Sequence, residues 1–424
     1  MSSRVHRIGP VTIFAFLTIG LAFCSVWFGR GGSLKELDPQ GTRGLGAGAP
    51  SPAPSPARLP IAADGITYNM AQEAAWIDSQ HFAVGRWDGS LSIFAFNQSQ
   101  ESGPIITTAI SSPSSKGVQM ITWVAPGVFA TSNDDGSMIV WKSVSGNWRD
   151  LKPLNVLKYA STFGIANSGT SFKTGNTLYF VAGHENGHVT IWSGKIDSAG
   201  LTFVRDVNLR SSHPLNPFNL YNVRGVAPVF WTSTTGYVVT GSEDGDLCIV
   251  EIPSGKILSR TVYNPKAQRG INSIAVFGQN LLVANCAVGA DDKNLWYYWI
   301  DRNDWSITLR DSTNLKVNPD APQVYNFDVI WGLYSKGVCF FSSTEEGALW
   351  MGTVTSDRKL SVFGYQNVTV PVGSALAFGL NGELLLVSYN LYEFTTGSDK
   401  VPVNGSDPGR LPQSQSLQSW PMRN

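Results

Sequence analysis

The sequence predicts an all-β fold built from one hairpin that recurs along most of the chain. Residues 129–141 read as an apolar strand, a tight turn at Asp135 and Gly136, and a second apolar strand rich in β-branched and aromatic residues. An Asp-Gly pair can supply the positive φ angles that a tight hairpin needs. The same pattern returns at 82–94, 180–192, 238–250, 282–299 and 338–350. A charged fraction of only 15%, with 43 glycines and 14 tryptophans, also suits a large β core with many turns.

The spacing of these copies predicts how the hairpins assemble. The turn glycines of the clearest copies lie at positions 89, 136, 187, 245 and 347, so the first three intervals are 47, 51 and 58 residues. A period of about 40 to 60 residues with four short strands per unit is typical of a β-propeller. Six hairpins are explicit, and strands at 375–378, 383–388 and 391–394 predict a seventh sheet.

That seventh sheet has no outer strand of its own in the sequence that follows it. We therefore expect a seven-bladed β-propeller in which residues 65–68, ahead of the first blade, supply the missing strand and close the ring. Closure removes exposed sheet edges that would otherwise template aggregation. The aromatic run at 296–299 is expected to pack into the core on both faces of its sheet.

The repeated cassette resembles the repeats of the WD40 family. The resemblance is clearest at 129–141, 180–192 and 238–250, where a small residue and an Asp-Gly-type turn precede alternating Ile or Val, with Trp141 and Trp192 closing two of the third strands. The family's Ser/Thr–His–Asp–Trp hydrogen-bonded network is not recognisable in any repeat. The resemblance covers about residues 66–396, and it implies a rigid ring whose loops take part in protein–protein interaction.

The N-terminal region predicts a membrane segment. Residues 9–28 carry no charge and are mostly apolar, and about 20 such residues can cross a bilayer as a helix. We expect a transmembrane anchor at 9–29 after a short flank at 1–8; the alternatives are a cleaved signal sequence and, less favoured, a soluble apolar helix. Because a short N-terminal flank usually stays in the cytoplasm, the propeller is expected on the non-cytoplasmic side, as part of a single-pass membrane protein.

Composition sets the remaining boundaries. Residues 30–63 are rich in Gly, Ala, Pro and Ser and predict a disordered linker, and residues 397–424 predict a disordered tail. The propeller is then expected to occupy 64–396. Potential glycosylation sequons do not settle the membrane orientation, because several are expected by chance in a sequence so rich in Ser and Thr. They lie at Asn97, Asn367 and Asn404.

Charge and cysteine content exclude some classes of function. The formal net charge is 0, which argues against a nucleic-acid partner, since such a partner favours a basic surface. The chain has four cysteines, one of them in the N-terminal apolar run, and the other three are expected to be buried free thiols in strands rather than a disulfide framework. They are Cys24, Cys248, Cys286 and Cys339.

One motif suggests zinc chemistry, but its context does not. His184, Glu185 and His188 match H-E-x-x-H, in which a helix places two histidines on one face to bind zinc. Here Asn186 and Gly187 form a predicted hairpin turn, so the two histidines would lie on opposite arms. We expect an ordinary turn, with a weak metal site across it as a minor alternative. Templates for hydrolases, phosphate-binding loops and sialidase-like propellers do not fit, so no catalytic residue, cofactor or metal is predicted.

The predicted functional feature is a surface. The turns between second and third strands should gather on one rim of the ring, where acidic residues dominate and would dock a basic or polar partner. These residues are Arg86, Trp87, Asn133, Asp134, His184, Glu185, Glu243, Asp244, Asp291, Asp292, Glu345 and Glu346. The alternative is that they are ordinary solvated turn residues without a partner. The insert at 205–228 is longer than a blade needs, and its Arg and aromatic residues suit an interface. They are Arg210, Phe218, Tyr221 and Arg224.

The leading functional hypothesis is a membrane-tethered propeller that serves as a non-catalytic scaffold for other proteins, whose identity the sequence does not give. An enzyme or metal-binding propeller with ligands converging on the central channel is the alternative. A secreted carbohydrate-binding propeller is a weaker one. Three or more His, Asp or Glu side chains within metal-bonding distance would favour the enzyme.

Overall fold

The computed structural model places the repeated cassettes in one compact unit, residues 51–424. Within it the structure describes residues 57–59, 71–86, 88–95, 106–109, 117–144, 146–195, 200–211, 220–262, 270–288, 293–321, 323–334, 337–367, 375–378, 383–387 and 391–395. All described strand pairings are antiparallel, as short tight-turn connections require.

Four sheets of four strands each come from consecutive stretches of the chain. The first holds β2 (Ala71–Trp76), β3 (His81–Arg86), β4 (Ser90–Ala95) and β5 (Ile106–Ala109), and the second β6 (Val118–Ala125), β7 (Val128–Asn133), β8 (Met138–Val144) and β9 (Asn147–Val156). The third holds β10 (Ala166–Thr174), β11 (Thr177–His184), β12 (His188–Lys195) and β13 (Thr202–Asn208). The fourth holds β14 (Val223–Trp231), β15 (Gly236–Ser242), β16 (Asp246–Ile252) and β17 (Ile257–Val262).

The remaining strands form a larger sheet and a closing sheet. The larger one holds β18 (Ile271–Phe277), β19 (Asn280–Val288), β20 (Leu295–Ile300), β21 (Ile307–Thr313), β22 (Gln323–Tyr334), β23 (Gly337–Thr344), β24 (Ala348–Val354) and β25 (Leu360–Asn367). The closing one holds β26 (Ala375–Phe378), β27 (Glu383–Val387), β28 (Leu391–Thr395) and β1 (Ala57–Leu59).

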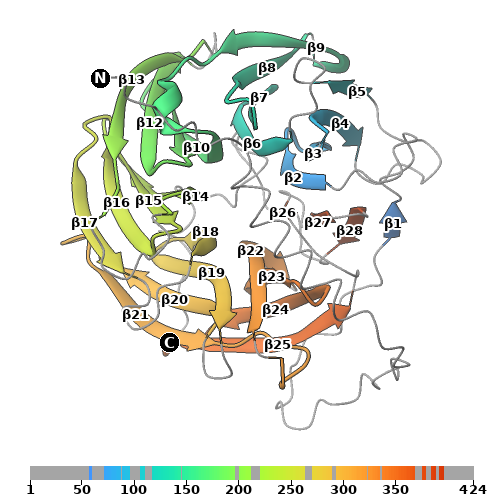
Figure 1. Cartoon of the computed structure of the whole chain (residues 1–424), viewed down its shortest axis with the longest axis vertical. Coiled ribbons are helices and arrows are strands. Elements are labelled where there is room, and N and C mark those ends of the chain that lie inside the picture. The colour runs from blue at the N-terminus through green and yellow to red at the C-terminus, as the bar shows by residue number, and fades with distance from the viewer. Residues whose placement is uncertain are drawn as a thin grey trace, which may run out of the picture. The chain divides into compact units, whose positions relative to one another are not determined.

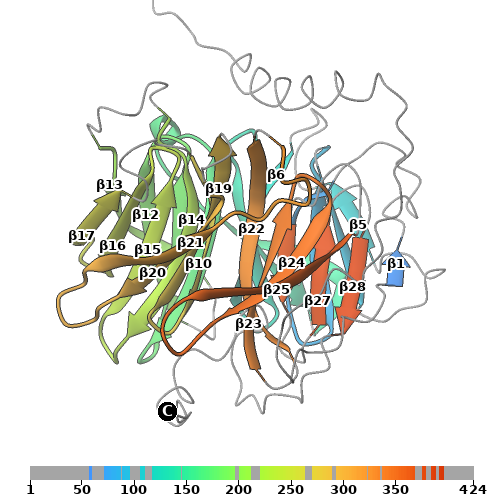
Figure 2. The same ribbon diagram turned by 90° about the horizontal axis from the view of Figure 1, so that it is seen from below.

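The sheets are arranged around a common axis as the blades of a β-propeller. The first strand of each four-strand unit lies near the centre and the fourth lies at the periphery (Figure 1). Seen from the side, the inner strands run between the two faces of the ring (Figure 2). This confirms the all-β propeller that the period of the cassettes predicts.

The number of blades differs from the prediction. Seven separate blades were expected, but the described strands form six sheets, five of four strands and one of eight. The eight-stranded sheet forms because β19 extends beyond its pairing with β18 and β20. Its last residues pair with β22, with Cys286 opposite Tyr325 and Val288 opposite Gln323. Five other cassettes turn back at this point with a glycine, whereas here Val288 stands at the equivalent position, three residues after Asn285, and the chain continues as a strand. The prediction of seven blades is therefore wrong.

The closing strand also comes from a different place than expected. Residues 65–68 lie outside the described residues, and the strand that pairs with β28 is β1. Its register places Ala57 opposite Glu393 and Leu59 opposite Leu391. The principle of closure by an N-terminal strand holds, but the strand falls inside the segment 30–63, where a linker was expected.

A transmembrane helix forms no part of the fold that the structure shows. The predicted anchor at 9–29 lies outside the described residues. Within the described residues, no helix has the length and apolar character needed to cross a membrane. One turn of 3-10 helix, η2 (Ser161–Phe163), is the helical element that interrupts the described strands. The fold class is corrected accordingly to an all-β propeller of six sheets.

The hydrophobic core lies between neighbouring sheets. Each cluster of buried apolar side chains combines residues from two adjacent units, such as Val140 and Phe180 in one and Val181 and Val250 in the next. Burying one such side chain stabilises the fold by about 1.5–3 kcal/mol. The aromatic run behaves as predicted, since buried Tyr297 and Tyr298 belong to clusters on opposite faces of their sheet. Cys248 and Cys339 are buried free thiols, also as predicted.

Candidate interaction surface

Five turns between second and third strands share one geometry. In each, the amide of the turn glycine donates to the carbonyl three residues earlier. The pairs are Gly89 and Arg86 at 3.1 Å, Gly136 and Asn133 at 2.9 Å, Gly187 and His184 at 3.2 Å, Gly245 and Ser242 at 2.9 Å, and Gly347 and Thr344 at 3.0 Å. The glycines have φ between 75° and 85°, whereas Asp135 is not left-handed. The turn therefore needs one left-handed residue, not two, which explains why the glycine is the residue that these five turns share.

These turns are tied to the chain that precedes the innermost strand of the same sheet. In four units the residue after the second strand donates its backbone N–H to a carbonyl at the beginning of the first strand, either just before it or, for Tyr325, within its first three residues. The pairs are Asp134 and Gly117 at 3.0 Å, Glu185 and Ile165 at 2.8 Å, Glu243 and Asn222 at 2.8 Å, and Glu345 and Tyr325 at 2.9 Å. The same face of each sheet unit is thus built from one turn and one preceding segment, held rigidly together.

Much of the predicted rim points into the molecule. Arg86, Asn133 and His184 are completely buried, and Asp244 is 1% exposed. The partly exposed carboxylates accept hydrogen bonds from the preceding segments. Asp134 accepts from Gly117 N at 3.0 Å and from Gln119 Nε2, Glu345 from Tyr325 N at 2.8 Å, and Glu346 from Val317 N at 2.7 Å and Asn318 N at 2.9 Å. Trp87, Phe218, Asp291 and Asp292 lie outside the described residues.

The structure brings together two of the residues predicted from the 205–228 insert, Arg210 and Tyr221. Exposed Arg210 donates from Nε to the carbonyl of Asn186, in the β11–β12 turn, at 2.6 Å. Its guanidinium carbon lies 5.1 Å from the ring centroid of Tyr221, a cation–π contact. Arg224 is exposed and donates from Nε to Glu243 Oε1 at 2.8 Å.

Arg224 owes its position to a β-bulge. The register of β14 shifts between Val223 and Gly225, which leaves Arg224 without a partner residue on β15. Equivalent shifts occur at the start of five other inner strands, β2, β6, β10, β18 and β22. A bulge re-aims the side chain of the extra residue, and in the fourth sheet that residue is an arginine.

Residues outside the predicted set complete this surface. The segment of η2 packs on the β11–β12 turn, where Asn186 donates from its backbone N to Phe163 O and from Nδ2 to Thr162 O, both at 2.9 Å. Phe163 stacks on His188 with ring centroids 4.2 Å apart. A Cβ on Gly164 would lie 2.8 Å from Glu185 Cβ, so this approach requires glycine. We call residues 159–164, 185–188, 210, 221 and 224 the anchored surface.

The buried side chain of His184 supports the anchored surface from inside the protein. Its Nδ1 lies 3.3 Å from Gly164 O and its Nε2 2.8 Å from Thr190 Oγ1. Because a carbonyl only accepts, Nδ1 carries the proton and Nε2 accepts from Thr190, which in turn accepts from Trp192 Nε1 at 3.0 Å. Burial lowers the pKa of His184 to about 4, so the ring is neutral and serves as a link between β12 and the η2 segment. The H-E-x-x-H match is thus a hairpin turn, as predicted.

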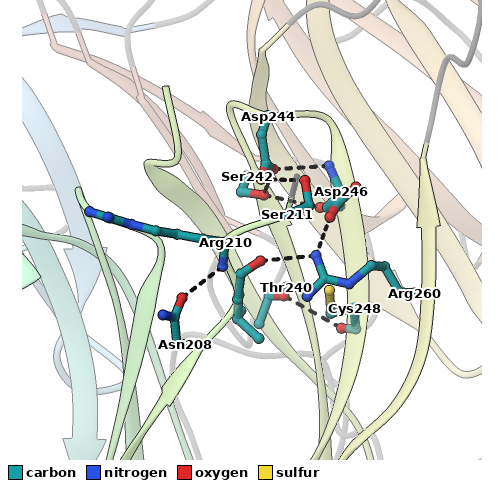
Figure 3. A network of polar contacts seen from close by, with 10 residues as sticks. Asn208, Arg210, Ser211, Thr240, Ser242, Asp244, Asp246, Cys248 and Arg260 are labelled. Carbon is teal, nitrogen blue, oxygen red and sulfur yellow. Dashed lines mark hydrogen bonds and ion pairs between the residues drawn. The ribbon is translucent and has the colours of Figure 1, made fainter. Parts of the chain in front are cut away.

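A second polar network holds the chain on both sides of Arg210 (Figure 3). The carbonyl of Leu209 accepts from Arg260 Nη1 at 2.9 Å, and Ser211 Oγ donates to Asp244 Oδ2 at 3.2 Å. The Arg210 backbone N donates to Asn208 Oδ1 at 3.0 Å. Figure 3 shows the side chain of Arg210 pointing away from this network while Ser211 enters it.

The centre of the network is a buried ion pair. Arg260 on β17 donates from Nη1 to Asp246 Oδ2, and Asp246 is 1% exposed. Asp244 Oδ1 accepts from the backbone N of Asp246 at 3.2 Å and from Ser242 Oγ. Burial and the neighbouring carboxylate of Asp244 raise the pKa of Asp246, against the opposing effect of Arg260. The network joins β15, β16 and β17 to the segment that carries Arg210.

Two carboxyl groups lie on the inner strands. Asp328, on β22, accepts from Ser273 Oγ at 2.5 Å, Leu376 N at 2.8 Å and Val329 N at 2.8 Å. Burial raises its pKa to about 6, and burial followed by the charge of Asp328 raises the pKa of Glu73, on β2, well above its usual range. These contacts join neighbouring inner strands rather than form a ligand site.

Comparison of the chain with known proteins does not identify a relative that could suggest a role for this surface. No protein-family model matches the chain, and no curated protein is detectably similar to it in sequence. The structure itself shows a β-propeller. Among the described residues, no three His, Cys, Asp or Glu side chains lie close enough together to hold a metal ion.

Sequence reasoning missed part of the anchored surface. Tyr159 and Phe163 precede β10 in a stretch without a motif, and their role depends on contacts with His184 and His188, at ring distances of 4.5 Å and 4.2 Å. The signal that could have pointed to them is Gly164, a left-handed glycine directly ahead of an inner strand.

Proposed function

We propose that the protein is a non-catalytic binding module, a propeller that holds another protein on its anchored surface. The observation that carries this proposal is the convergence of segments from two neighbouring sheets on a single rigid, partly exposed patch that holds arginine and aromatic side chains. Such side chains contribute most of the binding energy at protein interfaces.

Rigidity is the physical reason to favour binding at this place. The exposed groups are held by the hydrogen bond that Arg210 donates to the backbone carbonyl of Asn186, by the side chain of His184 and by the Asp244–Asp246–Arg260 network. A surface ordered before association loses less conformational entropy on binding than a mobile loop does.

The resemblance to the WD40 family in particular, beyond the propeller architecture, is supported by the hydrogen bonds of three tryptophans. Indole N–H groups donate to threonine hydroxyls in three units, a partial form of the network that the sequence assigned to no repeat. The pairs are Trp141 and Thr131 at 2.9 Å, Trp192 and Thr190 at 3.0 Å, and Trp350 and Thr344 at 3.2 Å. A relation to that family would fit a scaffold.

The test is site-specific photo-crosslinking. A benzoylphenylalanine introduced at Tyr221 should give a discrete protein adduct in an extract of cells that make the protein, identified by mass spectrometry. The matched control places the same group at Leu309, on the outer strand β21, where the side chain is 47% exposed. Absence of an adduct at position 221, or the same adducts at both positions, would rule out a specific protein-binding role for this surface.

A further inference from the structure

The anchored surface presents two guanidinium groups in a similar state. Arg210 and Arg224 each use Nε for an internal contact, to Asn186 O at 2.6 Å and to Glu243 Oε1 at 2.8 Å. Within the part of the chain that the structure describes, their terminal nitrogens make no hydrogen bond to protein. Both side chains are exposed, and Tyr221 lies between them in sequence and under the first of them in space.

Most of the carboxylates near them in the described part of the chain are already engaged. Glu243 is paired with Arg224, and Asp206 lies 3.2 Å from His188 Nδ1. Glu185 packs closely against Gly164. On the neighbouring units, Asp134, Glu345 and Glu346 accept backbone N–H groups. Most of the rim carboxylates that the structure describes are therefore bound within the protein, and the terminal N–H groups of the arginines remain for a partner.

The backbone that carries these arginines is held in place. Residues 208–211 each make a hydrogen bond to a neighbouring group, and Arg224 sits at the bulge that begins β14. Two planar forks with fixed Nε atoms match the geometry of carboxylate groups better than flexible lysines would. An aromatic ring beside them suits the apolar part of a peptide side chain.

We propose that Arg210 and Arg224 bind the carboxylate side chains of an acidic peptide segment of the partner protein, with the Tyr221 ring, which lies against Arg210, as an apolar contact. This inference rests on the proposed binding function and specifies its chemistry. It reverses the expectation from the sequence, in which an acidic rim would attract a basic partner.

The experiment uses the full-length protein and short synthetic peptides labelled with fluorescein. One peptide carries several Glu and Asp residues, a second replaces them with Gln and Asn, and a third replaces them with Lys. Fluorescence anisotropy should show binding of the acidic peptide that weakens as salt increases, because exposed charges are screened. The amide and lysine peptides should bind at least tenfold more weakly.

The variants identify the site. The double variant R210Q/R224Q should weaken binding of the acidic peptide by about tenfold to a hundredfold, as expected for the loss of charged hydrogen bonds. The variant R149Q is the matched control, because Arg149 is an exposed arginine on the outer strand β9, and it should bind like the wild type. Thermal melting of each variant shows whether it is folded.

Three outcomes would overturn the proposal. They are equal binding by R210Q/R224Q and wild type, preference for the lysine peptide, and no binding of the acidic peptide up to about 1 mM. Failure here combined with a specific crosslink at position 221 would refute only the acidic chemistry. Failure of both experiments would refute the binding function as well.

Discussion

His184 shows how one side chain can suggest catalysis in the sequence and serve structure in the fold. As a zinc ligand, the minor alternative that the H-E-x-x-H match offered, it would need an exposed, basic imidazole. In the structure it is buried, neutral and hydrogen-bonded at both nitrogens, to Gly164 O and Thr190 Oγ1. The ring joins the η2 segment to β12, and its burial makes it sensitive to acid.

Acid should weaken the fold through His184. Its folded pKa of about 4 lies below its usual 6.5, so the unfolded chain binds more protons between these values. The contribution of the neutral ring to stability is present above pH 6.5 and is lost as the pH falls towards 4, by up to about 3 kcal/mol. Urea unfolding at several pH values should show that His184→Gln reduces this dependence. An unchanged pH dependence in the variant would mean that the ring is not buried in solution.

Asp328 should act in the opposite direction. Its pKa is raised from 3.8 to about 6, so the folded protein binds the extra proton between these values. Its contribution to stability is present below pH 3.8 and is lost as the pH rises through 6, again by up to about 3 kcal/mol. Asp328→Asn should remove this part of the pH dependence, although loss of the acceptor for Leu376 N lowers stability throughout. Parallel stability curves for variant and wild type would contradict the assignment.

The hairpin turn is the element on which the molecule is built, and its copies are not equivalent. Gly136 and Gly187 occupy the same turn position with φ of 79° and 76°. A Cβ at Gly136 would meet Tyr159 Oη at 3.9 Å, an ordinary contact. A Cβ at Gly187 would lie 2.8 Å from Arg210 Cγ and 3.0 Å from Tyr221 Cβ. The third copy of the turn therefore also supports the anchored surface.

Alanine substitution at these two glycines should separate the two roles. Gly136→Ala should cost about 1 kcal/mol, the price of placing a Cβ in the left-handed region. Gly187→Ala should cost more, about 2–3 kcal/mol, because Arg210 and Tyr221 must also move. Only the second variant should lose the crosslink formed by a probe at position 221. Equal losses of stability, measured by chemical denaturation, would show that the close packing around Gly187 does not matter.

The β-bulges of the inner strands are a second feature that recurs from sheet to sheet. Each inner strand from β2 to β22 begins with one, and the bulged residue of β14 is Arg224. The sequence around Arg224 contains nothing that distinguishes a bulged from a regular strand. The bulge depends on pairing with β15, which is why sequence reasoning placed Arg224 in a long insert and not at the beginning of a strand.

At the scale of the whole molecule, closure depends on β1 and β28. Three residue pairs join an N-terminal segment to the last sheet, and the chain between them spans the whole propeller. Closing such a long loop costs conformational entropy, so this sheet should open more readily than the others.

Removal of the closing strand tests this view. Deletion of residues 1–60 should lower the melting temperature by several degrees and increase hydrogen exchange in β27 and β28, because a few backbone hydrogen bonds of about 1 kcal/mol each are lost. Deletion of residues 1–50 retains β1 and is the control. Identical melting and exchange in the two truncated proteins would exclude β1 as the closing strand.

The sequence alone determined the turns, the alternation of buried residues and the propeller architecture, because Asp-Gly-type turns and β-branched runs act locally and recur at similar intervals. Tertiary structure decided what depends on pairing between distant residues. It joined β18–β25 into one sheet through β19 and β22, and it chose residues 57–59 to close the ring. It also decided which charges face solvent. Carboxylates at the turns found backbone N–H donors close by, whereas the outer nitrogens of Arg210 and Arg224 did not, and no local pattern encodes that difference.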